Sequence, residues 1–319
     1  MSGKTNLIPK NEDVAEIVKR SFGENAIKIE RFLTGSCHFV FDVETDGKRK
    51  IVVRISKPEN QSFLKNALYW SELLRPKGIP LPKILAFDLG ETTFPYIVLE
   101  RLKGKDLGLV YKQLKKSEKK SLAIELAKIQ NMTATLPKAK SFGFVENYET
   151  NSLCRNWTDV LRKSLDRSRN RIEDIGIFNA KAVDRVEEKL VEFENYFSQI
   201  EPIGFLDDIT TKNVIVDEGK LSGIVDVDNV CFGDNLLTIA LTRMSLILSN
   251  DDLDYIKFWT SEINYNAEKK RILDFYTALF CVDFMSEIGQ TFNKETPLQI
   301  DEEKFARLHL ILGKLLVRI

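Results

Sequence analysis

The most constraining feature of this sequence is a β-hairpin pattern within residues 204–234. Two short runs rich in β-branched residues, 213–217 and 221–227, flank the tripeptide EGK centred on Gly219. A glycine-containing connection of this length between two such runs is a hairpin signal. We therefore expect the chain to turn back on itself at Gly219, with the two runs paired as antiparallel strands.

The open end of this hairpin would gather three polar side chains. Pairing about Gly219 brings Asn213 opposite residues near Val225. Asp226 is one position further along, and Asp208 lies five residues before Asn213, in the loop that leads into the first strand. Because Mg²⁺ takes oxygen ligands, commonly one or two side chains with substrate phosphates, Asn213 and Asp226 can hold it. Asp208 would stand beside the metal, free to accept a hydroxyl proton.

An Asp-x4-Asn loop followed, after a hairpin, by a metal-binding Asp is the kinase arrangement for phosphoryl transfer. The alternative is a surface hairpin whose acidic side chains are solvated. We favour the functional interpretation because Asp226 lies within an apolar strand end and because the hairpin is predicted independently of the motif.

These residues resemble the aminoglycoside phosphotransferase family, which has the protein-kinase-like two-lobe fold. The family usually reads His-Gly-Asp-x4-Asn, then a strand ending Ile-Asp-x-Asp or similar, then Gly-Asp-Pro; this chain has NVIV from Asn213 and SGIVDVDNVCFGD from residue 222. The resemblance implies that Asp208 is the catalytic Asp and that Asn213 and Asp226 bind the metal. It also implies that Asp228 and Asp234 are supporting acids.

The chain departs from the family pattern at two places. Leu206-Asp207 replaces His-Gly, and Asn235 replaces the proline of Gly-Asp-Pro. The first change alters the backbone that enters the loop of Asp208, whereas the three oxygen donors keep their identity.

Composition excludes several other classes. The 319 residues include 47 basic and 47 acidic side chains, so net charge gives no attraction toward nucleic acid, and none is expected as a partner. Four dispersed cysteines without a Cys-x-x-Cys, and no apolar signal core or long apolar run, predict a reduced, cytoplasmic protein with no membrane association. Only His38 and His309 are present, which disfavours a histidine-rich zinc site and a Ser-His-Asp triad. P-loop and Rossmann glycine motifs are absent from the sequence.

The first hundred residues read as strands. After an amphipathic helix over residues 13–22, the predicted strands cover 26–33, 39–45, 50–55, 84–88 and 96–99. The turn Thr34-Gly35-Ser36 would lie over the nucleotide phosphates in a kinase-like fold, which makes Gly35 and Ser36 candidate phosphate contacts through free N–H groups. Alternatively, it is an ordinary β-turn.

Arg54 is the one charge in the apolar run of the third strand. The resemblance implies that it carries a cation toward the phosphates; the alternative is an outward-facing side chain. Its partner should be a Glu on the next helix, 61–74, but neither Asn66 nor Glu72 matches cleanly, so the partner stays open.

The segment from Glu100 to Leu102 resembles the family hinge. The resemblance implies that main-chain groups of Glu100 and Leu102 bind the adenine of the nucleotide; the alternative is a plain strand–helix connector. We expect the boundary between the lobes here. Residues 1–102 would form the nucleotide-binding lobe, and residues 103–319 a larger helical lobe with the catalytic hairpin and the acceptor site.

The helical part has patterns over 117–133, with Ser117 as N-cap, and over 180–200, 236–248, 253–262, 267–288 and 302–317. On one of these helices Asp283, Glu287 and Gln290 form a polar stripe at helical spacing. Facing the cleft, the stripe could receive a cationic or hydroxyl-rich acceptor. Facing solvent, it would be the solvent-exposed face of a core helix.

The sequence therefore predicts an α+β, protein-kinase-like fold with a five-stranded antiparallel sheet lobe and a mostly helical lobe. The predicted function is a small-molecule kinase that uses Mg²⁺ and transfers the γ-phosphate of ATP or GTP to an alcohol group. An aminoglycoside and other small alcohols are equally consistent as acceptor. The alternative is a nucleotide-binding module without catalysis. A protein kinase is disfavoured, since the Gly-rich loop, Asp-Phe-Gly and Ala-Pro-Glu are missing.

Overall fold

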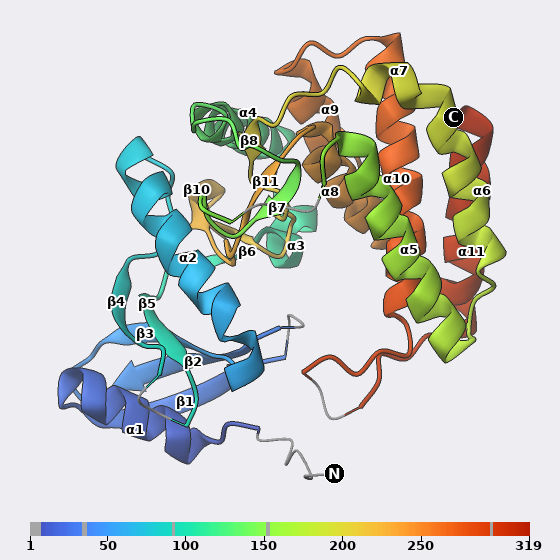
Figure 1. Ribbon diagram of the computed structural model, residues 1–319. Helices are drawn as coiled ribbons and strands as arrows, with labels where there is room; N and C mark the ends of the chain where they lie inside the picture. The colour runs from blue at the N-terminus through green and yellow to red at the C-terminus, as the bar shows by residue number, and fades with distance from the viewer. Residues whose placement is uncertain (1–7, 34–36, 91–92, 151–153, 294–295) are drawn as a thin grey trace.

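The computed structural model describes residues 8–33, 37–90, 93–150, 154–293 and 296–319. The chain forms two lobes of unequal size, with the sheet of the first lobe below and the helices of the second above it (Figure 1). The predicted α+β two-lobe fold is confirmed.

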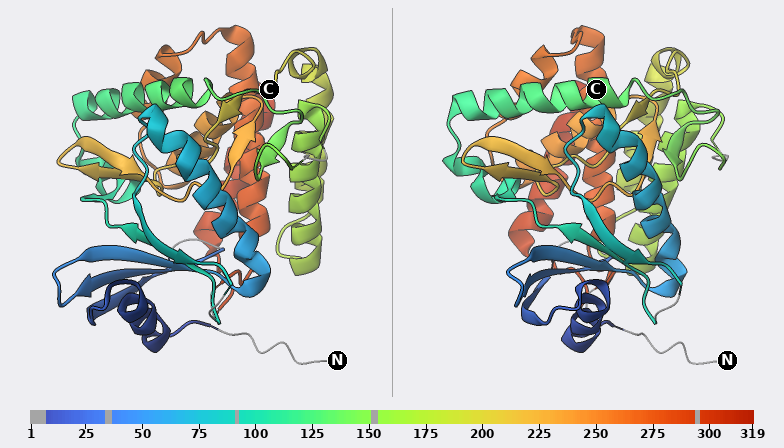
Figure 2. Two further views of the ribbon diagram at one scale, coloured as in Figure 1. Left: turned by 60° about the vertical axis from the view of Figure 1, so that its left-hand side comes forward. Right: turned by 90° about the vertical axis from the view of Figure 1, so that its left-hand side faces the viewer.

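The first lobe is a five-stranded antiparallel sheet with the strand order β1-β2-β3-β5-β4. Apolar residues alternate with polar ones along β2, so that Phe39, Phe41 and Val43 point into one core layer. Helix α1 (Asn11–Phe22) covers that layer, and α2 (Gln61–Leu74) lies against the other face through Leu64 and Ala67 (Figure 2). The strands are β1 (Ala26–Phe32), β2 (Phe39–Thr45), β3 (Lys50–Ile55), β4 (Ile84–Asp88) and β5 (Tyr96–Glu100).

Helix α2 connects the two lobes. Its first half packs on the sheet, whereas Trp70 and Leu74 in its second half belong to the core of the second lobe. The indole of Trp70 donates a hydrogen bond of 2.9 Å to the carbonyl of Val145, in strand β7 (Gly143–Val145). The helix therefore fixes the lobes against each other by burial on both sides.

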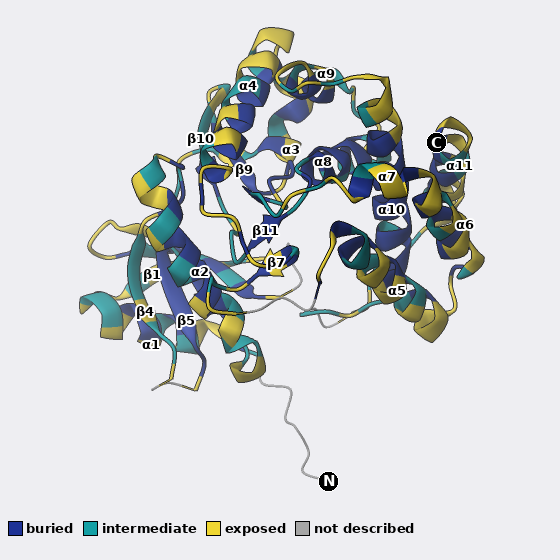
Figure 3. Ribbon diagram, turned by 45° about the horizontal axis from the view of Figure 1, so that its top comes forward, coloured by how far each residue is buried: buried dark blue, intermediate teal, exposed yellow. Residues whose placement is uncertain are grey.

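The second lobe is built around α10 (Ala267–Glu287), which is buried along most of its length (Figure 3). It packs against α5 and α8 and also contacts α6 and α11. The other helices are α3 (Leu107–Val110), α4 (Lys116–Thr133), α5 (Trp157–Ile175), α6 (Lys181–Leu190), α7 (Glu194–Phe197), α8 (Leu236–Leu248), α9 (Asp254–Ser261) and α11 (Glu302–Arg318).

The second lobe also contains two small three-stranded sheets. One has the order β10-β9-β6 and the other β7-β11-β8. Their strands are β6 (Lys105–Asp106), β8 (Gly204–Phe205), β9 (Val214–Asp217), β10 (Lys220–Ile224) and β11 (Val230–Phe232). The predicted hairpin is thus present as β9 and β10, and its turn has positive φ angles at Glu218 (48°) and Gly219 (77°).

Three sequence expectations were wrong in detail. The helix predicted over residues 180–200 is broken into α6 and α7 by a 3₁₀ turn, Val191–Phe193. Helix α4 begins at Lys116 rather than after Ser117, because the Glu118 side chain accepts a hydrogen bond from the backbone N–H of Lys115. The second hairpin strand ends at Ile224 and does not continue to residue 227.

Among the described residues, no helix is both long and apolar enough to span a membrane.

Candidate active site

The loop before β9 is organised by hydrogen bonds around Asp208. The hydroxyl of Thr210 donates to Asp208 Oδ1 at 3.0 Å, and the carboxamide of Asn213 donates to the Asp208 carbonyl at 2.8 Å. Because the Nδ2 of Asn213 is used in this way, its Oδ1 is left to accept or ligate. The loop thus holds both side chains that the sequence assigned to it.

The entry to this loop is held from helix α4. The carboxamide of Gln130 donates to the carbonyl of Leu206 at 2.7 Å and accepts from its N–H at 2.9 Å. Gln130 is 3% exposed, so this pair of bonds is shielded from water. Leu206 itself is buried in the core. The backbone that replaces His-Gly is therefore fixed by a residue that sequence reasoning missed, since nothing local marks a glutamine 76 positions away.

Asp226 follows the hairpin at its open end. The backbone N–H of Val225 donates to the carbonyl of Asn213 at 2.9 Å, which brings Asp226 next to the loop of Asp208. Asp226 has a φ of 64°, in the left-handed region, where Asp is among the residues best tolerated. This turn ends the strand and leaves the Asp226 side chain 43% exposed. Asp208, Asn213 and Asp226 therefore share one edge of the hairpin.

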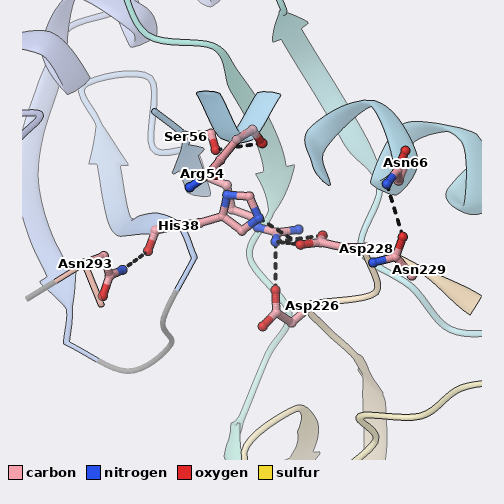
Figure 4. Close-up of polar contacts among 9 residues, drawn as sticks. His38, Arg54, Ser56, Asn66, Asp226, Asp228, Asn229 and Asn293 are labelled. Atoms are coloured by element: carbon pink, nitrogen blue, oxygen red, sulfur yellow. Dashed lines mark hydrogen bonds and ion pairs between the residues drawn. The ribbon is translucent and has the colours of Figure 1, made fainter. Parts of the chain in front are cut away.

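Arg54 on β3 reaches across to this edge. Its Nη2 lies 2.7 Å from Oδ1 of Asp226 and 2.8 Å from Oδ1 of Asp228 (Figure 4). The side chain of Arg54 is only 7% exposed, so the pairing is inside the protein. The partner that the sequence left open is thus a pair of acids from the second lobe and not a glutamate of α2.

A histidine completes this network. The Nε2 of His38, on the segment leading into β2, lies 2.8 Å from Oδ2 of Asp228, and His38 is 5% exposed. Helix α2 contributes instead a carboxamide contact, in which Asn66 donates to the Oδ1 of Asn229 at 3.1 Å. The resemblance implied a supporting role for Asp228, but its contact with His38 was not predicted, because 190 residues separate the two.

Burial and charge set the protonation of the acids around the loop. Burial, followed by the charge of Asp226, raises the pKa of Asp208 to about 7, although the residue keeps an exposed surface through which water weakens the effect. Burial and the neighbouring Asp208 raise the pKa of Asp207 to about 8. For Asp228, burial is outweighed by Arg54 and His38, so that its pKa falls to about 2.

The donor set suits Mg²⁺ better than a softer metal. Asn213 and Asp226 offer a carboxamide and a carboxylate oxygen, and hard cations prefer such ligands. Within the described residues, no three His, Cys, Asp or Glu side chains are grouped to hold a metal. A site with two protein oxygens is therefore one that substrate phosphates and water would complete, and the residues present fit Mg²⁺ bound together with a nucleotide.

The expected nucleotide contacts are placed in part. Gly35 and Ser36 lie outside the described residues. Glu100 ends β5, and its N–H donates to the carbonyl of Lys83 at 2.9 Å. The carbonyl of Leu102 accepts from the guanidinium of Arg101 at 2.9 Å. The N–H of Glu100 and the carbonyl of Leu102 could therefore bind an adenine only after giving up these hydrogen bonds.

A recess lies between the sheet and helix α2, beside Arg54 and Asp226. Apolar side chains of β4, β5 and β10 line it, among them Ile97, Leu99 and Ile224. Leu99 directly precedes the hinge residue Glu100. The recess therefore continues from the charged edge of the site toward the hinge.

The polar stripe of α10 does not lie on a solvent-facing side. Asp283 is 8% exposed, and its Oδ1 accepts from Arg167 at 2.9 Å and from Ser168 at 3.2 Å, both on α5. Glu287 is partly buried, and burial followed by the charge of Asp283 raises its pKa. Asp283 thus lies against α5 and is paired there, whereas Gln290 lies beyond the end of α10 and is not part of a helical stripe.

Comparison with known proteins agrees with the two-lobe fold. The family described as phosphotransferase enzyme family (APH) matches residues 29–244. No curated protein matched the sequence. Solved structures similar to this chain include the apo form of a thermostable mutant of aminoglycoside phosphotransferase APH(4)-Ia, at 15% identity and a TM-score of 0.67, covering 95% of this chain and 97% of that one.

Two further structures are similar over nearly their whole length. ADP-bound aminoglycoside phosphotransferase APH(2'')-Ib is 14% identical with a TM-score of 0.65, and the match covers 97% of this chain and 98% of that one. The streptomycin–ATP–APH(2'')-IIa ternary complex has the same identity and TM-score, and the match covers 97% of both chains. At 14–15% identity, the similarity to these structures establishes the fold alone.

Proposed function

The chain belongs to the phosphotransferase enzyme family, and from that premise we propose that it is a small-molecule kinase. It would transfer the γ-phosphate of ATP or GTP to a hydroxyl of a small acceptor. The observation that carries this proposal is the shared edge of Asp208, Asn213 and Asp226, with the cation of Arg54 beside it. Residues 1–102 would bind the nucleotide, and residues 103–319 would carry the catalytic hairpin and the acceptor.

Each side chain has a defined task in this reaction. Asp208 accepts the proton of the acceptor hydroxyl, whose oxygen then bonds to the γ-phosphorus while the bond to the β–γ bridging oxygen breaks and releases the nucleoside diphosphate. A carboxylate with a pKa near 7 is suited to this role at neutral pH. Asn213 and Asp226 would hold Mg²⁺, which neutralises phosphate charge when it is bound. Arg54 would contribute a cation to the phosphates, and Gly35, Ser36, Glu100 and Leu102 main-chain contacts to the nucleotide.

A second candidate function is nucleotide binding without catalysis. One observation favours it: Arg54 Nη2 is already bonded to the carboxylate of Asp226, the side chain that would hold the metal. The Leu206-Asp207 pair in place of His-Gly points in the same direction. The two candidates differ in turnover and agree in nucleotide affinity, so one pair of measurements separates them.

The test combines calorimetry with a turnover assay. A nonhydrolysable ATP or GTP analogue, titrated with and without Mg²⁺, should bind more tightly with the metal. Turnover is then measured with ATP, Mg²⁺ and a panel of aminoglycosides and small alcohols. Asp208→Ala should lose turnover and keep nucleotide affinity, whereas Asp217→Ala, a control on the far end of the hairpin, should change neither. Binding without any turnover would favour the second candidate, and absence of nucleotide binding would reject both.

A further inference from the structure

Arg54 is held by two carboxylates that differ in their exposure to water. Its Nη2 lies 2.7 Å from Oδ1 of Asp226, and 2.8 and 3.0 Å from the two oxygens of Asp228 (Figure 4). The side chain of Asp226 is 43% exposed, whereas that of Asp228 is 15% exposed and that of Arg54 is 7% exposed. One nitrogen of the guanidinium therefore bridges a buried acid and an acid at the surface.

Asp228 is the fixed partner in this bridge. Both of its oxygens accept from Arg54, and Oδ2 also lies 2.8 Å from Nε2 of the buried His38. A buried charge that loses its partner is strongly destabilising, so Arg54 and Asp228 hold each other inside the protein. Asp228 therefore anchors Arg54 whether or not Asp226 is bonded as well.

Asp226 is the partner that Arg54 can release. Within the described part of the chain, the Oδ1 that accepts from Arg54 is the one hydrogen-bonded atom of the Asp226 carboxylate. A carboxylate with this exposure regains water when it loses a partner, so the exchange costs it little. Arg54 can thus give up Asp226 while Asp228 still compensates its charge.

The main chain of both residues is fixed. Arg54 lies in β3, which is paired with β2 on one side and with β5 on the other. The N–H of Val225 donates to the carbonyl of Asn213 at 2.9 Å, which holds the chain just before Asp226. Both Arg54 and Asp226 line the recess between the sheet and α2. Arg54 can therefore exchange partners by reorienting its guanidinium on a fixed strand.

The contact with Arg54 opposes metal binding at Asp226. Asp226 and Asn213 are the residues that would hold Mg²⁺, and a guanidinium 2.7 Å from the carboxylate repels a second cation. The phosphates of a nucleotide offer Arg54 several charged oxygens in the planar geometry that a guanidinium binds best. A nucleotide that takes up the guanidinium of Arg54 would therefore leave the Asp226 carboxylate to the metal.

We propose that Arg54 gates the metal site. It occupies the Asp226 carboxylate in the free protein and releases it when the nucleotide phosphates bind the guanidinium, so that metal and nucleotide bind as a coupled pair. This inference rests on the proposed nucleotide and metal sites, but the competition for Asp226 is a property of the free protein. The bond between Arg54 and Asp226 is then the resting state of a working site and not a sign of lost catalysis.

The first test measures metal binding without nucleotide. Mn²⁺, which also prefers oxygen ligands, is titrated into the full chain, and the free ion is followed by electron paramagnetic resonance. Arg54→Gln should bind Mn²⁺ at least about tenfold more tightly than the natural protein, and adding Asp226→Asn should remove this gain. Arg49→Gln is the matched control, because Arg49 directly precedes β3 and pairs with Glu24; it should bind Mn²⁺ as the natural protein does.

The second test measures nucleotide binding without metal. A nonhydrolysable ATP analogue is titrated by calorimetry in the presence of EDTA. Arg54→Gln should bind it at least about tenfold more weakly than the natural protein, because the phosphates lose a charged hydrogen-bond donor. The two effects of this variant thus have opposite signs, whereas damage to the fold would weaken the binding of both ligands.

Asp226→Asn tests the exchange from the other side, at a residue exposed enough for the variant to fold. Without metal, it should bind the ATP analogue more tightly than the natural protein, because the phosphates no longer compete with the Asp226 carboxylate for Arg54. Asp208→Asn is the control for the loss of one negative charge: Asp208 bonds Thr210 and not Arg54, so its gain should be smaller.

Two results would overturn the proposal: Mn²⁺ binding no tighter in Arg54→Gln than in the natural protein, or metal-free nucleotide binding no tighter in Asp226→Asn than in Asp208→Asn. If Arg54→Gln does not fold, the comparison of the two aspartate variants decides alone. Failure of the kinase function appears separately, as absence of acceptor phosphorylation in a protein that shows both effects. If no nucleotide binds, the proposed nucleotide site is rejected and with it the gate.

Discussion

The Nη2 atom of Arg54, on β3 of the first lobe, lies 2.8 Å from Oδ1 of Asp228, in the segment after β10 of the second lobe. The two side chains are 7% and 15% exposed, so the pair is shielded from water. In the aminoglycoside phosphotransferase-like arrangement expected from the sequence, a glutamate of α2 would hold this cation. Here Asp226 and Asp228 hold it, so that Arg54, proposed to contact the phosphates, and Asp226, proposed to bind the metal, are positioned by one network.

Asp228→Asn should destabilise the protein because it leaves the buried guanidinium of Arg54 with less compensation. Removing one partner of a buried ion pair costs about 3–5 kcal/mol. Because the contact of Arg54 with Asp226 remains, we expect the free energy of unfolding, measured in urea, to fall by about 3 kcal/mol. The matched control is Asp217→Asn, since Asp217 pairs with the 79% exposed Lys103. An exposed pair of this kind contributes little to stability, because water and salt screen it. Equal losses for the two variants would contradict the proposed role of the pair.

The same pair predicts how this loss depends on pH. Arg54 and His38 outweigh burial and lower the pKa of Asp228 to about 2. A carboxyl with a lowered pKa contributes stability that is present above its ordinary pKa of about 4 and is lost as the pH falls toward 2. The difference between the natural protein and Asp228→Asn should therefore be constant from about pH 5 to 8 and shrink below about pH 4. Unfolding curves across this range check it.

The parts of the site that are local in sequence were predictable. The turn at Gly219, the pairing of Asn213 with Val225 and the neighbouring position of Asp226 follow from strand periodicity and hairpin length, and all are found. Helices such as α2 and α8 were predicted with the bounds that the structure shows, because their apolar spacing is regular. Local rules fix such features before any tertiary contact forms.

The parts that depend on contacts between distant segments were not predictable. Arg54 and Asp228 are 174 positions apart, and no pattern in the sequence links them or ties His38 to them. Gln130 is likewise distant from the Leu206 backbone that it holds. The burial of the α10 stripe depends on α5, whose Arg167 covers Asp283. In each case tertiary packing determines which residues meet. Amphipathic spacing shows which face of a helix is buried but does not identify the element that packs against it.

Gly104 lies between β5 and β6, and we expect Gly104→Ala to destabilise this segment. Gly104 has a φ of 110°, and an added Cβ would lie 2.2 Å from the carbonyl oxygen of Val216 in β9. Backbone would have to move, so the expected cost is about 2 kcal/mol or more. Gly313→Ala is a control of opposite sign: the site in α11 is open, and alanine should stabilise the helix by about 0.5–1 kcal/mol. Thermal unfolding of both variants measures the contrast; an unchanged Tm for Gly104→Ala would refute the close contact.

Asp207 makes a separate prediction about stability at alkaline pH. Burial and the charge of Asp208 raise its pKa to about 8, so the folded protein binds a proton that the unfolded chain releases near pH 4. Its contribution to stability is therefore fully present below about pH 4 and lost as the pH rises through 8. Asp207→Asn, which cannot ionise, should raise the Tm at pH 8.5 by on the order of 2–4 °C and leave it unchanged at pH 4. Asp217→Asn should show no such dependence, and a lower Tm for Asp207→Asn at pH 8.5 would contradict the shift.

Asp208 should set the pH dependence of phosphoryl transfer, because only its ionised form can accept the hydroxyl proton. Burial and Asp226 raise its pKa to about 7, so kcat/KM for the acceptor should rise about tenfold per pH unit below that value and level off above it. The hydrogen bond from Thr210, 3.0 Å from Oδ1, lowers the pKa. Thr210→Val removes that bond at nearly constant volume and should move the midpoint of the profile to higher pH. A midpoint that stays in place in this variant, or lies below about pH 5 in the natural protein, would show that another group governs the rate.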